Sequence, residues 1–269
     1  MLKKELSVKV IFLLFIFFTF SWFFINFSFE SNSFWHNLFS DTYGIVAAFG
    51  GLWGLRIGER WGGLKSVMGK AIGFFSLGLL FQAFGQFIYS IYYLFLQVEV
   101  PYPSLGDLGY FGSIPFYIYA VLMLAKASGV RISLKSFGNK IQAVLIPVLG
   151  LVISYYVFLR GYEFDWSAPL VIFLDFGYPL GQAVYIILAI LTFLLSRRVL
   201  GGIMRGKILL ILLALVIQYI ADFMFLYQFS REAWSAGGIN DLTYLIAYFI
   251  MTYSLIQLKL VSDKLRQGS

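Results

Sequence analysis

Residues 207–229 read KILLILLALVIQYIADFMFLYQF, and only Lys207 and Asp222 in this stretch carry a charge. A helix needs about 20 mostly apolar residues to cross the hydrocarbon core of a bilayer, so the stretch predicts a membrane-spanning helix. The whole chain follows the same pattern, since 60% of its 269 residues are hydrophobic and 12% are charged. An ordinary soluble domain has roughly 25% charged residues. The chain is therefore expected to be an all-α, polytopic membrane protein.

Eight apolar runs of this kind predict eight transmembrane helices. They lie near 8–28, 42–57, 70–96, 107–126, 140–160, 169–195, 207–229 and 239–259. The first run lacks a small-residue cleavage site and is too long for the apolar core of a signal peptide, so we expect it to be retained. Residues 1–269 then form a single membrane domain, with 263–269 as a cytoplasmic tail.

The basic residues indicate the orientation. Eighteen of the twenty Lys and Arg lie at the N-terminus, in the loops after the second, fourth and sixth runs, or after the last run. They include Lys3, Lys4, Lys9, Arg56, Arg60, Arg131, Arg197, Arg198 and Arg205. Only Arg160 and Arg231 fall on the opposite side, with the acidic residues Glu30, Asp41, Glu99, Asp107, Glu163, Asp165, Glu232 and Asp241. By the positive-inside rule both termini are cytoplasmic, and the protein lies in the cell membrane. The net charge of +7 thus reflects topology, and no nucleic-acid partner is expected.

An acidic-aromatic element opens each even-numbered run. Its four copies are SDTYG, GDLGYFG, LDFGYPLG and NDLTYLI, with the acidic residues Asp41, Asp107, Asp175 and Asp241 spaced by 66, 68 and 66 residues. The third, fifth and seventh runs open on Lys70, Lys140 and Lys207. This self-similarity predicts four helical-hairpin repeats, roughly 1–66, 67–134, 135–202 and 203–262.

The repeated Asp residues have two interpretations, as N-caps of helices or as ligand-binding groups. Asp175 favours the second, because Pro169 and the apolar LVIFL precede it and carry it deeper. A Tyr follows three residues later at Tyr110, Tyr178 and Tyr244. Each lies on the face of its Asp by helical spacing. It is either an interfacial anchor or a hydrogen-bond donor to that Asp.

Asp222 is the strongest candidate for a ligand-binding residue. It sits within an apolar run, where a carboxylate is costly unless it is paired or functional, and no basic residue in a run offers a counter-ion. We expect it to face the bundle interior and to be protonated at rest. The candidate site comprises Asp222, Gln218, Gln86, Gln82, Asp175, Tyr178 and Gln182. The alternative is that these polar side chains merely join neighbouring helices.

Other motifs are few. The chain has no cysteine, and its single His36 cannot form a multi-histidine metal cluster, so no metal or cofactor is expected. His36 is interpreted as a surface residue, and no G-x-S-x-G, Walker or H-E-x-x-H motif assigns catalytic residues. A ridge of small residues at Gly50, Gly54, Gly58 and Gly62 indicates either packing within the bundle or a homodimer seam.

The stretch PYPSLGDLGYF (101–111), preceded by GQFIYSIYY (85–93), resembles an element of multi-helix membrane sensor modules. Those modules stand at the N-termini of some bacterial diguanylate cyclases and histidine kinases, where a P-S-L-A-D-x-x-Y sequence opens a helix. The eight-helix plan is also similar to the lysoplasmalogenase family of membrane hydrolases. That similarity implies acidic residues at both of two helix ends, where this chain has Gln86 and Asp222.

We therefore expect an integral membrane receptor or sensory module that binds a small or lipid-like ligand in an outer-half pocket. Its expected partners are membrane lipids, that ligand and a cytoplasmic signalling protein. Two alternatives stay open, a lipid-modifying hydrolase using Asp222 and Asp175, and a small-substrate transporter. A sensor needs a continuous last helix, an enzyme needs two carboxylates within reach of one water, and a transporter needs broken helices near the midplane.

Overall fold

A computed structural model of the chain describes residues 6–31, 33–98, 100–130, 135–196, 204–229, 231 and 233–267. Their order is α1 (Leu6–Ser28), α2 (Phe34–Thr42), α3 (Ile45–Arg60), a 3-10 turn (Gly63–Lys65), α4 (Val67–Ser90), a π-helical turn (Ile91–Leu96), α5 (Leu105–Ala127), α7 (Phe137–Ser154), a second π-helical turn (Tyr155–Leu159), α8 (Pro169–Ser196), α9 (Arg205–Phe229) and α10 (Ile239–Gln267). The expected all-α class is confirmed. Several residues used above to assign the orientation lie outside the described residues, namely Lys3, Lys4, Glu99, Arg131, Arg197, Arg198 and Glu232.

Seven of the described helices are long and apolar enough to cross a membrane: α1, α4 with its π-helical turn, α5, α7 with its π-helical turn, α8, α9 and α10. This confirms a multi-pass membrane protein. The eighth expected run, near 42–57, forms α3, which has 16 residues and follows the short helix α2 almost directly. A helix of that length spans about 24 Å at 1.5 Å per residue, less than the roughly 30 Å of a hydrocarbon core.

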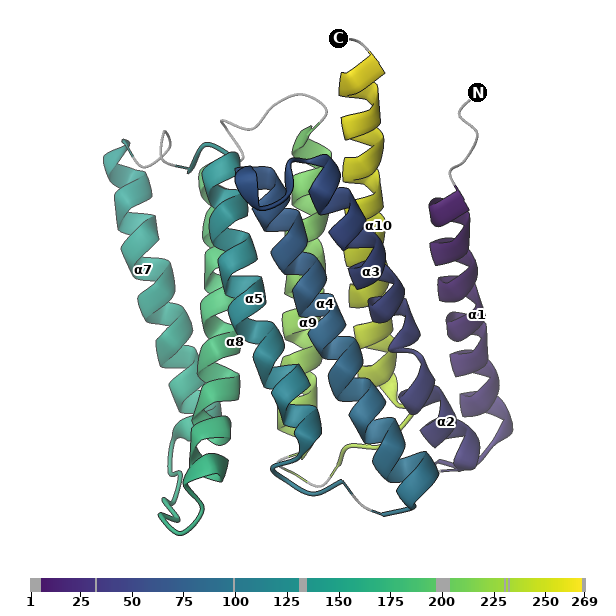
Figure 1. The fold of residues 1–269 in the computed structure, drawn as a ribbon. Coiled ribbons are helices and arrows are strands. Elements are labelled where there is room, and N and C mark those ends of the chain that lie inside the picture. The colour runs from purple at the N-terminus through teal and green to yellow at the C-terminus, as the bar shows by residue number, and fades with distance from the viewer. Residues whose placement is uncertain are drawn as a thin grey trace.

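Six helices form a closed ring. In order around the ring, α3 packs on α4, α4 on α5, α5 on α8, α8 on α9, α9 on α10, and α10 on α3. The remaining long helices, α1 and α7, stand outside the ring at opposite edges of the bundle (Figure 1), α1 against α10 and α7 against α8. Their outward faces carry exposed large apolar side chains such as Phe17 and Leu149. Lipid is the natural solvent for those faces.

The two ends of the ring differ in the residues that they carry. The first helix, α1, begins and the last, α10, ends at one end of the ring, which we call the terminal end, and α5, α8 and α10 begin at the opposite end, which we call the outer end after the orientation proposed below (Figure 1). Asp107 and Asp241 lie in the first turns of α5 and α10. Asp175 is the seventh residue of α8, and Asp41 lies in α2 just before α3. All four repeated Asp residues thus lie toward the outer end.

Glycine lets α3 approach both of its ring neighbours closely. A Cβ added at Gly50 would overlap Oγ1 of Thr252 on α10, and one at Gly54 would overlap Oγ of Ser76 on α4. These residues therefore pack within the bundle, and this part of the glycine ridge is not free for a second copy of the chain. Gly62 lies beyond α3 at φ 93°, a left-handed conformation that glycine adopts at little steric cost.

Candidate functional site

Asp222 lies in α9 with 5% of its surface exposed, and its side chain faces the interior of the ring. Tyr185 of α8 donates its hydroxyl hydrogen to Oδ2 of Asp222 at 2.5 Å. Tyr244 of α10 donates to Oδ1 at 2.9 Å, and Gln218, one turn earlier on α9, donates to the same oxygen at 3.1 Å. Three donors from three helices thus offset the cost of burying this carboxyl group.

The partners of Asp222 match the expectation only in part. The sequence predicts Gln218 on the same face, and Gln86, Gln82 or a tyrosine such as Tyr178 within reach. The described hydrogen bonds of Asp222 go to Gln218 and to two other tyrosines, Tyr185 and Tyr244. Tyr178 instead donates to Oδ1 of Asp107 at 2.8 Å. Sequence reasoning missed Tyr185, although it follows the buried Gln182 by three residues and shares its helix face.

Gln86 of α4 holds a comparable position in the first half of the chain. Its Oε1 accepts a hydrogen bond from the Tyr110 hydroxyl of α5 at 3.1 Å, and its Nε2 donates to the carbonyl oxygen of Ser40. The amide therefore joins α2, α4 and α5.

Gln82, one turn before Gln86, makes a second polar bridge across the ring. Its Oε1 accepts from the Tyr248 hydroxyl of α10 at 3.0 Å, and its Nε2 donates to Ser113 Oγ of α5 at 2.8 Å. The Tyr248 ring lies 6.0 Å from that of Tyr244, centroid to centroid. This stacking brings the Gln82 bridge next to the Asp222 cluster.

The hydrogen bonds repeat between the two halves of the chain. The first half contributes α3, α4 and α5 to the ring, and the second half contributes α8, α9 and α10. In each half, a Tyr of the third of these helices donates a hydrogen bond to a polar side chain of the second helix. A Tyr near the start of the first helix donates to an Asp of the other half. Each residue lies 134 to 136 positions from its counterpart. The pairs are Tyr110–Gln86 and Tyr244–Asp222, then Tyr43–Asp241 and Tyr178–Asp107. We call these four pairs, with the Gln82 bridge, Gln218 and Tyr185, the tyrosine network.

The repeated Asp residues are not N-cap residues. Ser104 is the N-cap of α5, and Asp107 completes a capping box by accepting from the Ser104 backbone N–H at 2.7 Å. Asp241 likewise accepts from the Gly237 N–H at 2.8 Å. Of the two interpretations of Tyr110, Tyr178 and Tyr244, a hydrogen bond to the Asp three residues earlier does not hold, because each phenol reaches past that short side chain and donates to a side chain of another helix.

Asp175 lies at the outer rim of the ring, where it accepts from the Tyr102 hydroxyl at 2.6 Å and from the Tyr162 hydroxyl at 2.8 Å. Burial, the largest cause, and the bond to Asp175 raise the pKa of Tyr102 in the loop before α5. The phenol therefore stays protonated as a donor. Asp175 is engaged with surface loops, and these bonds do not connect it to Asp222.

His36 is buried in α2, so the interpretation as a surface residue is wrong. Its exposed fraction is 3%, its Nδ1 lies 2.8 Å from Ser33 Oγ, and Gly237 packs against its ring. The absence of a Cβ at Gly237, where φ is 69°, leaves room for the imidazole.

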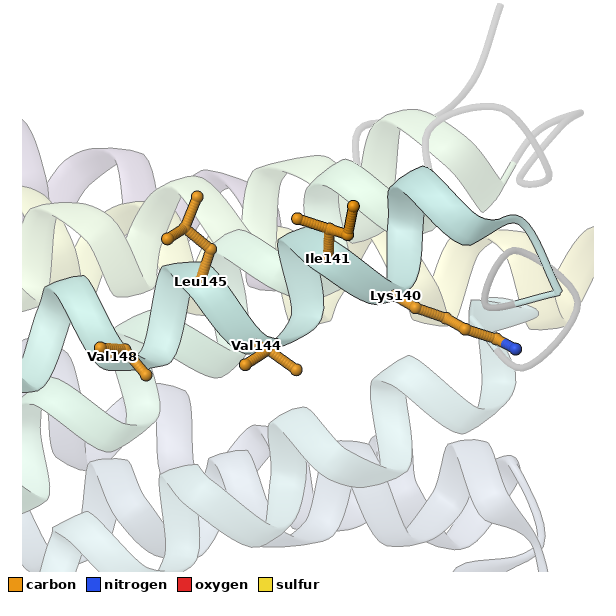
Figure 2. Close-up of a pocket in the computed structure, with 5 residues that line it drawn as sticks. All are labelled: Lys140, Ile141, Val144, Leu145 and Val148. Atoms are coloured by element: carbon orange, nitrogen blue, oxygen red, sulfur yellow. The ribbon is translucent and has the colours of Figure 1, made fainter.

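A hollow of about 480 Å³ lies on α7 and is lined by Lys140, Ile141, Val144, Leu145 and Val148 (Figure 2). It occupies the part of α7 near its N-terminal turn, outside the ring, and its lining is apolar apart from Lys140. This surface is distinct from the tyrosine network.

Comparison of the chain with protein-family models, with curated proteins and with solved structures finds no match. The resemblances to membrane sensor modules and to lysoplasmalogenases therefore rest on their sequence motifs alone.

Proposed function

We propose that this protein is a membrane sensory module in which the tyrosine network binds a small or lipid-like ligand and α10 transmits the change. The observation that carries this proposal is the continuity of α10, which runs unbroken from Ile239 to Gln267. Its 29 residues span about 43 Å at 1.5 Å per residue. That length exceeds the hydrocarbon core of a bilayer, and α10 projects beyond the other helices at the terminal end (Figure 1).

The outer half of α10 carries three members of the tyrosine network. Asp241, Tyr244 and Tyr248 receive or donate hydrogen bonds to α2–α3, α9 and α4 respectively. A ligand that inserts between these groups must exchange one or more of those bonds, and it then changes the forces on a single rigid helix. This is the kind of element whose position a ligand can bias.

The terminal half of α10 is joined to the neighbouring ring helices by polar contacts. Arg60 at the end of α3 forms an ion pair with Asp263 at 3.0 Å, and Trp61 Nε1 donates to the carbonyl oxygen of Leu258 at 3.2 Å. Lys207 of α9 donates to Gln257 at 2.8 Å. A shift of α10 would alter these contacts on the side where a signalling partner would bind.

The proposal includes the finer architecture expected from the sequence. The four hairpin units account for the antiparallel neighbours α4–α5, α7–α8 and α9–α10. Both termini are proposed to be cytoplasmic in the cell membrane, with the tyrosine network in the outer half of the bilayer and a cytoplasmic protein as the receiver of the signal.

Two alternatives draw less support from the geometry. A hydrolase needs two carboxylates that share one water, whereas Asp222 and Asp175 bond different tyrosines in the interior and at the rim. A transporter needs broken helices near the midplane, whereas α8 continues through Pro179 as one helix.

Native mass spectrometry of the protein in polymer nanodiscs, extracted directly from the expressing membrane, tests the binding role. We expect wild type to keep a bound molecule that survives mild removal of bulk lipid. Asp222→Leu should lose it, and Gly73→Ala, a change on α4 with nothing within 4 Å of the added carbon, should keep it. A wild-type spectrum without any retained molecule, or one unchanged by Asp222→Leu, contradicts the proposal.

A further inference from the structure

Within the part of the chain that the structure describes, the partners of Asp222 supply hydrogen bonds but no positive charge. Its described partners are two phenol hydroxyls and one amide, and all three donate to the carboxylate oxygens. Donors aimed at both oxygens suit an ionised carboxylate, which only accepts. An isolated negative charge within a membrane-spanning helix is strongly unfavourable, so it calls for a counter-ion or a proton.

Two buried oxygen atoms, one on a partner of this carboxylate and one on a tyrosine packed against another partner, have no hydrogen-bond partner among the described residues. They are Oε1 of Gln218 and the hydroxyl of Tyr117, and both side chains have no exposed surface. Gln218 uses its Nε2 to donate to Asp222, and the Tyr117 ring lies 5.9 Å from that of Tyr185, which donates to the same carboxylate. Buried polar atoms are normally satisfied, and these two oxygens keep unused acceptor capacity.

The first half of the chain provides an internal comparison. Gln82 and Gln86 stand where Gln218 and Asp222 stand in the second half, and both neutral amides have both ends bonded. The second half thus differs in having a carboxylate at the second position and a spare amide oxygen at the first. At these two positions, the second half therefore carries one negative charge and one hydrogen-bond acceptor free among the described residues, both of which the first half lacks.

We infer a binding site for one small monovalent cation, such as Na⁺, held by Oδ2 of Asp222, Oε1 of Gln218 and the Tyr117 hydroxyl oxygen. Oδ1 already accepts two hydrogen bonds, whereas Oδ2 accepts one and keeps a lone pair. Carboxylate, carbonyl and hydroxyl oxygens are the ligands that hard cations prefer. A single carboxylate balances one positive charge, and the described residues hold no group of three His, Cys, Asp or Glu that would suit a multivalent metal.

Thermal unfolding of the full chain in phosphatidylcholine nanodiscs, followed by tryptophan fluorescence at pH 7.5, tests the site with Na⁺ as the probe. NaCl is exchanged for choline chloride at constant ionic strength. We expect the wild-type unfolding temperature to rise with Na⁺ to a plateau, because a ligand that binds only the folded state stabilises it. Asp222→Asn should abolish this dependence.

Tyr117→Phe is the milder test, because the hydroxyl that it removes has no hydrogen-bond partner to lose among the described residues. It should keep the unfolding temperature in choline and weaken the apparent Na⁺ affinity about tenfold, equivalent to about 1.4 kcal/mol. Tyr162→Phe is the matched control, since it removes a hydroxyl bonded to Asp175 at the rim, outside the tyrosine network, and should lower the temperature in choline with the Na⁺ affinity unchanged.

Three results would overturn the inference. The first is a wild-type unfolding temperature equal in the two salts, which would leave a proton as the neutralising ion. The second is a Na⁺ effect that persists in Asp222→Asn, and the third is equal loss of Na⁺ affinity in Tyr117→Phe and Tyr162→Phe. These experiments measure how Na⁺ changes the stability of the fold and do not depend on any movement of α10. Failure of the cation site therefore leaves the proposed sensory role untouched.

Discussion

Tyr178 on α8 donates its hydroxyl hydrogen to Asp107 on α5 at 2.8 Å and so joins the two halves of the ring at the outer end. The other junction between the halves, where α10 meets α3, is bridged by Tyr43 and Asp241 at 3.4 Å. In both junctions the Asp also accepts a backbone N–H near the start of its own helix. In each junction, one carboxylate thus stabilises both the first turn of its own helix and a contact with another helix.

The two junctions should differ in strength. We expect Tyr178→Phe to destabilise the fold by about 1.5–3 kcal/mol, the range for a hydrogen bond to a charged group, and Tyr43→Phe to cost less because its bond is 3.4 Å long. Denaturant unfolding of both variants in one mild detergent measures the difference. Equal losses of unfolding free energy in the two variants would show that the hydrogen-bond distances do not determine which junction is stronger.

Glycine packing gives a second prediction. Gly54→Ala places a Cβ against Ser76 between α3 and α4, whereas Gly73→Ala on α4 meets nothing within 4 Å. We expect Gly54→Ala to destabilise by about 1–3 kcal/mol, as overpacking usually does. Gly73→Ala should be neutral or stabilise slightly, because alanine favours helix. Unfolding temperatures of the two variants, measured side by side, decide it. A tolerated Gly54→Ala would mean that α3 and α4 do not approach this closely.

Some features follow from composition and period alone, and others depend on side-chain reach. The apolar runs predict the long helices because bilayer thickness sets their length, and the cost of a buried charge predicts that Asp222 faces inward. Its partners Tyr185 and Tyr244 could not be predicted. A tyrosine hydroxyl reaches the neighbouring helix, and the spacing of residues along the sequence does not tell which helices are neighbours in the ring. The positions of α1 and α7 outside the ring could not be predicted either, because an apolar helix face can pack against protein or against lipid.

The pH dependence of stability should report Asp41 in α2, outside the membrane-spanning helices. Burial, then the nearby Asp241 carboxylate, raise the pKa of Asp41 to about 6, partly offset by the Ser90 hydroxyl. The folded chain therefore binds this proton more tightly than the unfolded chain. The resulting stabilisation is present below about pH 4 and is lost as the pH rises to about 6.

Asp41→Asn removes this dependence. We expect the variant to gain stability relative to wild type between pH 4 and pH 6.5, as measured by unfolding temperature. Asp165→Asn is the control, because bonds from Ser167 lower the pKa of the exposed Asp165 and its ionisation is complete over the upper part of this range. A difference between Asp41→Asn and wild type that stays constant with pH would refute the assignment.

The orientation can be tested without background labelling, since the chain has no native cysteine. Glu163→Cys places a thiol in the exposed loop before α8 at the outer end, and Lys65→Cys places one in the exposed turn after α3 at the terminal end. In intact cells we expect a membrane-impermeant thiol reagent to label Glu163→Cys and to spare Lys65→Cys. The reverse pattern would place the termini outside.

The coupling of the tyrosine network to the far end of α10 is tested most directly by a distance measurement between the terminal ends of α5 and α10. Spin labels at Ala127→Cys and Leu260→Cys in nanodiscs report it by pulsed electron paramagnetic resonance. Tyr244→Phe, which breaks the bond to Asp222, should shift or broaden the distance distribution. Tyr102→Phe, which breaks a rim bond to Asp175 away from α10, should leave it as in the wild type. A distribution that is the same in wild type and in both variants would contradict a sensory role for α10.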